Sequence, residues 1–329
     1  MTGAPLLVVD NLHVTFEGDS GRLTEAVAGV SFSLTRGQTL GIVGESGCGK
    51  SVTALSIMRL LPRTGTRVSG SVRFEGRELS GLPERQMQDL RGNRLAMIFQ
   101  EPMTSLNPSF TVGDQIAEAL TRHRGLSAKA ARSAVIDMLA RVRIASPRER
   151  VDEYPHKLSG GMRQRIMIAM ALICAPALLI ADEPTTALDV TIQAQILDLL
   201  AQLRQETDSA IMLITHDLGV VAEVCDDVAV MYAGQIVEQA PAARLFSAPQ
   251  HPYTVGLLGS IPLINTRRER LATISGTVPN LAAGFTGCRF SDRCPFADEN
   301  CRRQPPPIAE VAAAHFSRCW KAPLEALVA

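Results

Sequence analysis

The sequence predicts an α/β fold in which a parallel sheet carries a phosphate-binding loop. A short apolar run at residues 39–43 leads directly into a glycine-rich string at residues 44–51 and then into helical sequence. Strand-like and helix-like segments alternate between residues 178 and 215, which is typical of a parallel sheet with crossover helices. The 329 residues, 46% of them hydrophobic, are enough for a large core and exclude a small disulfide-stapled scaffold.

The N-terminal part of the sequence predicts an antiparallel β subdomain. Apolar and polar residues alternate around residues 6–16 and 30–34, which is the period of half-buried strands. Residues 71–74 read as a hairpin strand before a glycine turn, and residues 95–99 as a further buried strand. These strands precede the alternating α/β region and belong to the same domain.

A helical subdomain is expected at about residues 101–165, where prolines separate helical stretches such as 112–120 and 128–140. The next 16 residues, 166–181, carry no charge. This stretch is shorter than the ~20 residues of a membrane span and Pro176 interrupts it, so we interpret it as a buried helix, a turn and a buried strand.

The composition of the chain changes near residue 250, where we expect a domain boundary. Residues 1–250 hold the α/β pattern, which closes with a predicted hairpin at residues 228–237. Residues 251–329 are rich in proline and arginine and hold four of the seven cysteines. The sequence therefore predicts a nucleotide-binding domain followed by a small cysteine-rich, metal-binding C-terminal extension.

Charge and composition exclude some classes of partner. Lys plus Arg and Asp plus Glu both total 33, so no net field draws the chain to nucleic acid or to an anionic bilayer. Aromatic residues make up 4%, which disfavours base-stacking surfaces. The charge balance and the few aromatic residues therefore predict no nucleic-acid partner. The first 21 residues contain no Lys or Arg, so we expect no signal peptide and a cytoplasmic location.

Residues 44–51 match the phosphate-loop pattern G-x-x-x-x-G-K-[ST] after a predicted strand and before a predicted helix. Glycines allow backbone N–H groups to surround phosphates, and a helix N-terminus adds positive potential. Lys50 would reach the terminal phosphates of ATP, and Ser51 would ligate Mg²⁺. The predicted nucleotide-binding residues of this loop are Gly44, Glu45, Ser46, Gly47, Cys48, Gly49, Lys50 and Ser51.

Polar side chains also follow three other predicted strands, at the carboxyl ends where open α/β sheets bind ligands. Asp182 and Glu183 end the apolar run 177–181, and we predict Asp182 as a Mg²⁺ ligand and Glu183 as the general base for water. Gln100 is predicted to contact Mg²⁺ or the water, and His216 the γ-phosphate. Taken alone, either of these two residues is more often a plain strand end.

The string Leu158-Ser159-Gly160-Gly161-Met162 opens a helix that is predicted to run to about residue 174. Ser159 is a good N-cap, and Gly160 and Gly161 leave the first-turn N–H groups uncovered. The string is either a capped helix start or a second anion site.

With these motifs in place, the chain resembles the ATP-binding cassette (ABC) ATPases, in which the 158–162 string is the signature motif. The family's order is present in full: the loop 44–51, Gln100, the signature, Asp182-Glu183, residues 187–189 and His216. The resemblance implies a P-loop ATPase fold with catalytic residues Glu183, His216, Gln100 and Lys50.

The same resemblance implies a head-to-tail dimer and an adenine contact. Ser159, Gly160 and Gly161 of one subunit would complete the ATP site of the other. Phe16 stands where the family commonly has an aromatic residue, and it would stack on adenine, with an ordinary core phenylalanine as the alternative.

Residues 101–108, 215–223, 230–234 and 251–254 resemble the peptide-importer branch of that family, which serves dipeptide, oligopeptide and nickel uptake. This implies a peripheral ATPase subunit on the cytoplasmic face of the cell membrane. Its implied partners are two integral membrane permeases, a second ABC ATPase and an extracytoplasmic substrate-binding protein. The second ATPase is expected to be a paralogue, with a homodimer as the alternative, and nickel or another small solute stays open beside peptides.

The C-terminal cysteines Cys288, Cys294, Cys301 and Cys319 follow the spacing C-x5-C-x6-C-x17-C. In a cytoplasmic chain such a cluster favours a metal over disulfides. Structural zinc sites usually pair ligands two to four residues apart, and no gap here is that short. Four thiolates on wider loops favour an iron–sulfur cluster, and the branch resemblance points to [4Fe-4S] as well. Zn²⁺ and free thiols are the alternatives.

The sequence disfavours two functions other than transport. A soluble ABC ATPase that acts on DNA or ribosomes is disfavoured by the single phosphate loop, the lack of a long coiled coil and the absence of a basic excess. A regulatory scaffold with a redox-sensing cysteine segment is disfavoured by the intact Glu183 and His216.

Overall fold

The computed structural model describes residues 4–18, 21–100, 105–185, 190–260, 274–279 and 284–324. The chain forms two compact units that interleave along the sequence, and each is described by itself. The first unit comprises Met1–Leu6, Thr35–Gln38 and Gly81–Leu213. The second unit comprises Leu7–Leu34, Thr39–Ser80 and Ile214–Ala329.

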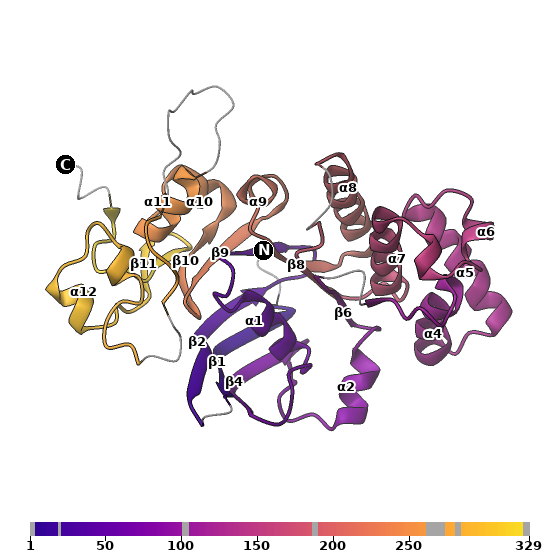
Figure 1. Ribbon diagram of the computed structural model, residues 1–329, viewed down its shortest axis with the longest axis horizontal. Coiled ribbons are helices and arrows are strands. Elements are labelled where there is room, and N and C mark those ends of the chain that lie inside the picture. Colours follow the sequence, from indigo (N-terminus) through magenta and orange to yellow (C-terminus); the bar gives the residue numbers. More distant parts are fainter. Residues whose placement is uncertain are drawn as a thin grey trace. The chain divides into compact units, whose positions relative to one another are not determined.

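The second unit contains a four-stranded antiparallel sheet in the order β2-β1-β4-β5 (Figure 1). Its strands are β1 (Leu7–Glu17), β2 (Leu23–Leu34), β4 (Thr66–Phe74) and β5 (Arg77–Glu78). Leu7, Val9 and Val14 of the central strand are buried. The register of β1 shifts between Val9 and Leu12, and Asn11 there has a positive φ of 49°. The predicted antiparallel subdomain is confirmed, with longer strands than the alternation indicated because a β-bulge interrupts the period.

The second unit also contains strands of a mixed sheet, in the order β11-β12-β10-β9-β3. They are β3 (Thr39–Val43), β9 (Asp227–Tyr232), β10 (Gln235–Pro241), β11 (Ala309–Ala312) and β12 (His315–Ser317). β3 pairs with β9 in parallel, and all five residues of β3 are buried. β10 pairs antiparallel with both β9 and β12. The C-terminal part of the chain therefore adds strands to the sheet that carries the glycine-rich loop, which the sequence did not predict.

Helices of the second unit connect these strands or cover them. They are α1 (Lys50–Ile57), α9 (Leu218–Val224), α10 (Ala242–Ser247), α11 (Pro252–Gly259), α12 (Glu299–Arg303) and the 3₁₀ helix η2 (Ser291–Arg293).

The first unit combines parallel strands with most of the helices. β6 (Leu95–Ile98) pairs in parallel with β7 (Leu178–Asp182), and β8 (Ala210–Ile214) lies on the other side of β7. Its helices are α2 (Glu84–Leu90), α4 (Val112–Arg124), α5 (Ala128–Arg141), α6 (Pro147–Arg150), η1 (Pro155–Lys157), α7 (Gly160–Leu172) and α8 (Val190–Thr207). The helices predicted at residues 112–120 and 128–140 are confirmed as α4 and α5.

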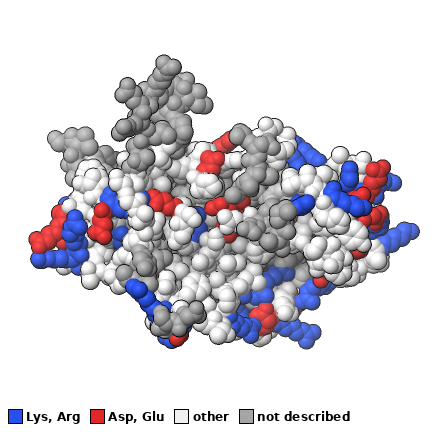
Figure 2. Space-filling model, in the orientation of Figure 1, with Lys and Arg blue, Asp and Glu red and all other residues white. Residues whose placement is uncertain are grey.

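Side-chain caps explain where these two helices begin. Thr111 accepts a hydrogen bond from the backbone N–H of Asp114 at the start of α4, and Ser127 caps α5 in the same way. Gly125, with φ at 63°, ends α4 in the left-handed conformation that glycine favours. Over α4 to α6, Figure 2 shows basic side chains beside acidic ones, in keeping with the balanced charge of the sequence.

The uncharged stretch at residues 166–181 forms what the sequence predicts. α7 ends at Leu172, a turn follows, and β7 begins at Leu178. Most of both segments is buried. Among the residues that the structure describes, no helix combines the length and the apolar character that a membrane crossing needs.

The second unit contains a buried histidine, His251. His251 is 1% exposed and caps α11, where its Nδ1 accepts a hydrogen bond from the backbone N–H of Tyr253 at 3.1 Å. Its ring is also hydrogen-bonded to the main chain of Arg318, whose guanidinium is the charged group nearby. Burial lowers the pKa of His251 from 6.5 to about 3, so this ring is neutral in the folded protein.

We expect this histidine to make the second unit less stable in mild acid. The unfolded chain binds a proton at His251 near pH 6.5 and the folded chain does not, so the free energy of unfolding falls by about 2 kcal/mol between pH 7 and pH 5. Urea unfolding followed by the fluorescence of Trp320, the single tryptophan, measures this loss. His251→Asn keeps a capping oxygen and is expected to flatten the pH slope, with His156→Asn at an exposed position as the control. An unchanged slope in His251→Asn would contradict the assignment.

Candidate functional site

The glycine-rich loop that follows β3 has a backbone that only glycine fits. Gly44, Gly47 and Gly49 have φ values of 151°, 78° and 103°. A Cβ on Gly44 would lie 2.2 Å from the carbonyl oxygen of Met231, and one on Gly49 would lie 2.5 Å from that of Ala26. The two ends of the loop are therefore held against neighbouring backbone, and the N–H groups between them are fixed in a tight turn.

This loop leads into α1, whose first turn is suited to an anion. The N-cap Gly49 provides no side-chain hydrogen bond to this turn, and a helix N-terminus attracts an anion. Lys50 is 5% exposed, and its Nζ donates to the carbonyl oxygens of Gly44 at 2.7 Å and Glu45 at 3.0 Å. The ammonium thus lies over the loop, where it can meet a phosphate. Ser51, also on the first turn of α1, is half-buried.

Phe16 and His216 lie in the same unit as this loop. Phe16 is half-buried on β1, between Thr24 and Thr66 of the neighbouring strands. His216 is exposed directly after β8, and Asp217 beside it caps α9. The roles of Phe16 and His216 stay predictions.

In the first unit, the acidic pair lies at the carboxyl end of β7. Asp182 is 4% exposed and ends the strand. Glu183 follows with φ at 47°, a left-handed conformation that costs about 1 kcal/mol or more for a residue other than glycine. The Nε2 of Gln100, which follows the parallel neighbour β6, donates to the Oε2 of Glu183 at 3.3 Å. The structure therefore brings Gln100, Asp182 and Glu183 together at one edge of the sheet, as the sequence predicts.

The signature string lies at the start of α7, in the same unit. Ser159 caps the helix, and its Oγ accepts a hydrogen bond from the N–H of Met162 at 3.3 Å. Ser159 and Gly160 are exposed, and a Cβ on Gly160 would meet nothing within 4 Å. The packing of this chain alone therefore does not require glycine at residue 160. Gln164, buried on α7, donates to the carbonyl oxygen of Pro184 and so ties the signature helix to the loop after Glu183.

Each unit, taken by itself, contains oxygen donors of the kind that magnesium ions bind. Mg²⁺ prefers oxygen ligands and usually keeps waters and substrate phosphates in its shell. The hydroxyl of Ser51, the carboxylate of Asp182 and the amide oxygen of Gln100 fit this preference. Residues 187–189 and 101–104, which carry part of the family resemblance, lie outside the described residues.

The expected metal centre at the C-terminal cysteines is wrong. Cys288, Cys294, Cys301 and Cys319 all lie in residues 284–324. Across the described parts of the chain, no group of three or more His, Cys, Asp or Glu side chains is placed to hold a metal ion. The [4Fe-4S] cluster and its Zn²⁺ alternative are therefore unsupported.

The surroundings of these thiols could not be read from the sequence. Burial raises the pKa of Cys288 to about 11 and also raises the pKa of Cys294 and of Cys319. The spacing of cysteines in the sequence carried no information on their protonation or on the direction of their side chains.

The sequence did not single out two side chains that touch the phosphate loop. The Oη of Tyr253 accepts a hydrogen bond from the N–H of Glu45 at 2.9 Å. Arg293 forms an ion pair with the carboxylate of Glu45 at 2.7 Å. Both lie more than 200 positions from Glu45, so no local pattern could have shown them.

Comparisons with known proteins agree with this geometry. Residues 27–186 match the family model described as ABC transporter, and residues 237–301 match the model for the C-terminal region of oligopeptide/dipeptide transporters. A probable peptide ABC transporter ATP-binding protein of Sinorhizobium fredii is 56% identical, over 96% of this chain and 95% of its own length. The dipeptide transport ATP-binding protein DppD of Bacillus subtilis is 53% identical, over 96% of this chain and 94% of its own length.

A solved structure shows the same fold. The ATP-binding cassette MJ0796, in a dimeric post-hydrolysis state bound to ADP and phosphate, has a TM-score of 0.64 and 25% sequence identity. The match covers 72% of this chain and 98% of that chain.

Three features define an ATPase of the P-loop class: a phosphate loop after a buried strand, an Asp-Glu pair at the end of a second buried strand, and a capped signature helix. The chain belongs to the ABC transporter family as an ATP-binding subunit that hydrolyses ATP. The predicted ABC ATPase fold, with its antiparallel and mixed sheets, is confirmed. The division of the chain near residue 250 stays a prediction.

Proposed function

We propose that this chain is the subunit that powers an importer of di- and oligopeptides across the cell membrane. The observation that carries this proposal is the match of residues 237–301 to the C-terminal region of oligopeptide/dipeptide transporters. It is supported by two relatives, named for peptide and for dipeptide transport, that align with 96% of the chain at 56% and 53% identity.

ATP would bind with its phosphates in the loop formed by residues 44–51. The backbone N–H groups of the loop and the first turn of α1 would hold the phosphates, and Lys50 would move from its carbonyl partners toward the terminal phosphates. Ser51, Asp182 and Gln100 would hold Mg²⁺, which supplies charge compensation for the phosphate oxygens. Phe16 would stack on adenine.

Hydrolysis would depend on Glu183 as the general base. Its carboxylate would accept a proton from water as the water attacks the γ-phosphate in line. Gln100, hydrogen-bonded to Glu183 at 3.3 Å, would orient the carboxylate and report occupancy of the site to the helical part of the chain. His216 would donate a hydrogen bond to the γ-phosphate and stabilise its developing charge.

The complete site would need a second ATPase subunit arranged head to tail. Ser159, Gly160 and Gly161 would reach the γ-phosphate bound by the other subunit, since Ser159 and Gly160 are exposed and Gly160 has open space around it. The solved relative is dimeric in a post-hydrolysis state. We propose a paralogue as the second subunit, with a second copy of this chain as the alternative that the experiment below distinguishes.

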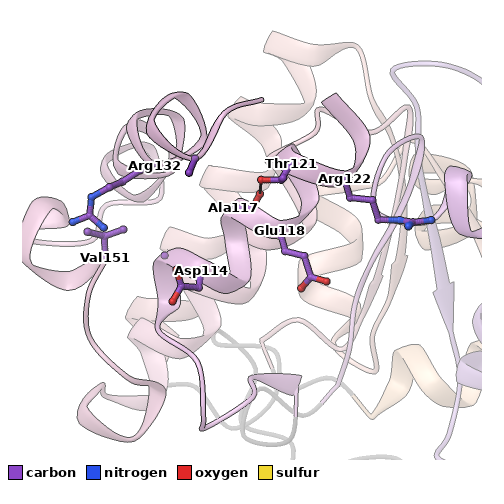
Figure 3. Close-up of a pocket in the computed structure, with 9 residues that line it drawn as sticks. Asp114, Ala117, Glu118, Thr121, Arg122, Arg132 and Val151 are labelled. Atoms are coloured by element: carbon purple, nitrogen blue, oxygen red, sulfur yellow. Dashed lines mark hydrogen bonds between the residues drawn. The ribbon is translucent and has the colours of Figure 1, made fainter. Parts of the chain in front are cut away.

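The helical part of the first unit would contact two integral membrane permeases on the cytoplasmic face of the membrane. It contains a cavity of about 490 Å³ along α4, α5 and the residues after α6 (Figure 3). Asp114 and Glu118 of α4 and Arg132 of α5 line this cavity with charge, and Val151 lines it with apolar surface. A permease segment with both polar and apolar side chains would fit there. An extracytoplasmic protein would deliver the peptide to the permeases.

Purification from membranes in mild detergent tests this assembly. Two integral membrane proteins and one further ABC ATPase are expected to copurify with the tagged chain, as identified by mass spectrometry. If the chain is recovered alone, or with ribosomes or nucleic acid, the transporter assignment is contradicted and only the ATPase assignment stands. If no second ATPase sequence is found in the complex, the dimer is formed by two copies of this chain.

A further inference from the structure

A short C-terminal segment packs directly on the phosphate loop. This segment, residues 288–294, contains η2 (Ser291–Arg293) and belongs to the same compact unit as the loop. Phe290 at its centre is 3% exposed and contacts Tyr232 and Tyr253, at ring-centroid distances of 5.1 Å and 5.4 Å. Since Tyr253 accepts a hydrogen bond from the N–H of Glu45, the aromatic cluster reaches the phosphate loop itself.

Arg293 holds the first part of the phosphate loop by a bidentate ion pair with Glu45. Its Nη1 donates to one carboxylate oxygen of Glu45 at 2.7 Å, and its Nη2 donates to the other at 3.0 Å. The rest of the guanidinium is also engaged, since Nε donates to the carbonyl oxygen of Ser275 at 2.9 Å and Nη2 to that of Ile274 at 3.2 Å. The Arg293 side chain is 7% exposed and the Glu45 side chain 26%, so this pair is partly shielded from water. Paired planar groups of this kind are among the most directional charge contacts in proteins.

Arg289 holds the other end of the loop through a turn. Its Nη1 donates to the carbonyl oxygen of Ala233 and its Nη2 to the carboxylate of Glu25, both at 2.6 Å. The next residue of the turn, Gly234, donates its N–H to the carbonyl oxygen of Cys48 at 2.9 Å. The two arginines of one short segment therefore fix the phosphate loop at Glu45 and at Cys48.

We propose that residues 288–294 are a built-in clamp of the ATP site, in which Arg293 and Arg289 are positioning residues for the phosphate loop. Arg293 also neutralises the one acidic side chain of the loop, Glu45. A triphosphate carries several negative charges, so an unpaired carboxylate at Glu45 would repel the nucleotide that the loop has to bind. The proposal rests on ATP binding at this loop and adds a role for a segment that lies outside the ATPase motifs.

The first test is the affinity of the purified full chain for ATP. Arg293→Gln removes the charge and leaves the half-buried Glu45 carboxylate without its cationic partner, so we expect the Kd for ATP to rise about tenfold. Adding Glu45→Gln to that variant removes the unpaired charge, and the double variant is expected to recover most of the lost affinity. A purely structural role of Arg293 would not be reversed by a second substitution on its partner.

Matched variants sharpen the result. Arg303→Gln lies on α12 in the same C-terminal part, pairs with Glu299 and is exposed, so it is expected to keep the parental Kd. Arg293→Lys keeps the charge and loses the bidentate geometry, so an intermediate Kd for ATP is expected. It also replaces Arg293→Gln as the test variant if the latter does not fold.

Two results would overturn the clamp. One is an Arg293→Gln protein that is folded and binds ATP as tightly as the parent. The other is a double variant that binds as weakly as Arg293→Gln. If the parent itself does not bind ATP, the assignment of the nucleotide site is contradicted instead. Failure of the clamp and failure of the nucleotide site are therefore distinguishable.

Discussion

Replacing Glu183 with glutamine is expected to reduce ATP hydrolysis about 10³-fold while ATP binding is retained. The amide has nearly the shape of the carboxylate but cannot take a proton from water. Its oxygen can still accept the hydrogen bond from Gln100 that now reaches Glu183 at 3.3 Å. Glu183 lies outside the phosphate loop and keeps a strained φ of 47°, which is typical of a residue whose direction matters for function.

The measurement is phosphate release in a single turnover, together with the Kd for ATP, on the parent and on Glu183→Gln. Glu206→Gln is a matched control, since Glu206 is an exposed carboxylate of α8 in the same unit and pairs with Arg141. Its turnover is expected to equal that of the parent. Unchanged turnover in Glu183→Gln would contradict the role of Glu183 as the general base.

Replacing Lys50 with methionine is expected to weaken ATP binding about 100-fold and to abolish hydrolysis. Methionine keeps most of the length of the side chain and removes its charge and its donors. Lys50 is 5% exposed, and its ammonium already lies against the carbonyl oxygens of Gly44 and Glu45. We expect the parent ammonium to exchange these neutral acceptors for the phosphate oxygens of ATP, whereas methionine has no donor for those oxygens.

Equilibrium binding of ATP measures this loss. Lys157→Met serves as the control, since Lys157 is an exposed lysine in η1 that pairs with Glu153. The control is expected to bind ATP like the parent. A Lys50→Met protein with the parental Kd would contradict the assignment of the phosphate loop.

Local patterns predicted much of the fold. The strand β3, the loop after it and α1 follow from an apolar run, spaced glycines and a Lys-Ser pair, all within 20 residues. The helices α4 and α5 follow from helical spacing and from caps at Thr111 and Ser127. β11 and β12 were missed because each has only three or four residues, and their stability comes from pairing with a distant strand.

The candidate site, like the fold, could be predicted from the sequence only in part. The sequence placed Gln100, Asp182 and Glu183 correctly at neighbouring strand ends, because parallel strands share one carboxyl edge. It could not show that Arg293 pairs with Glu45, since many arginines and acids are available and only the tertiary fold selects this pair. The cysteine spacing was misread for a related reason, because spacing fixes neither the direction nor the protonation of a thiol.

Peptide transport out of vesicles, with the ATPase side of the complex facing outward, tests the central claim most directly. The purified complex is inserted into lipid vesicles with ATP outside, on the side of this chain, and the substrate-binding protein with a labelled dipeptide or oligopeptide inside. The account predicts that the peptide leaves the vesicle lumen in an ATP-dependent way with the parent chain and stays there with Glu183→Gln. Export of the peptide from the lumen at the same rate with Glu183→Gln, or transport of Ni²⁺ in place of any peptide, would contradict it.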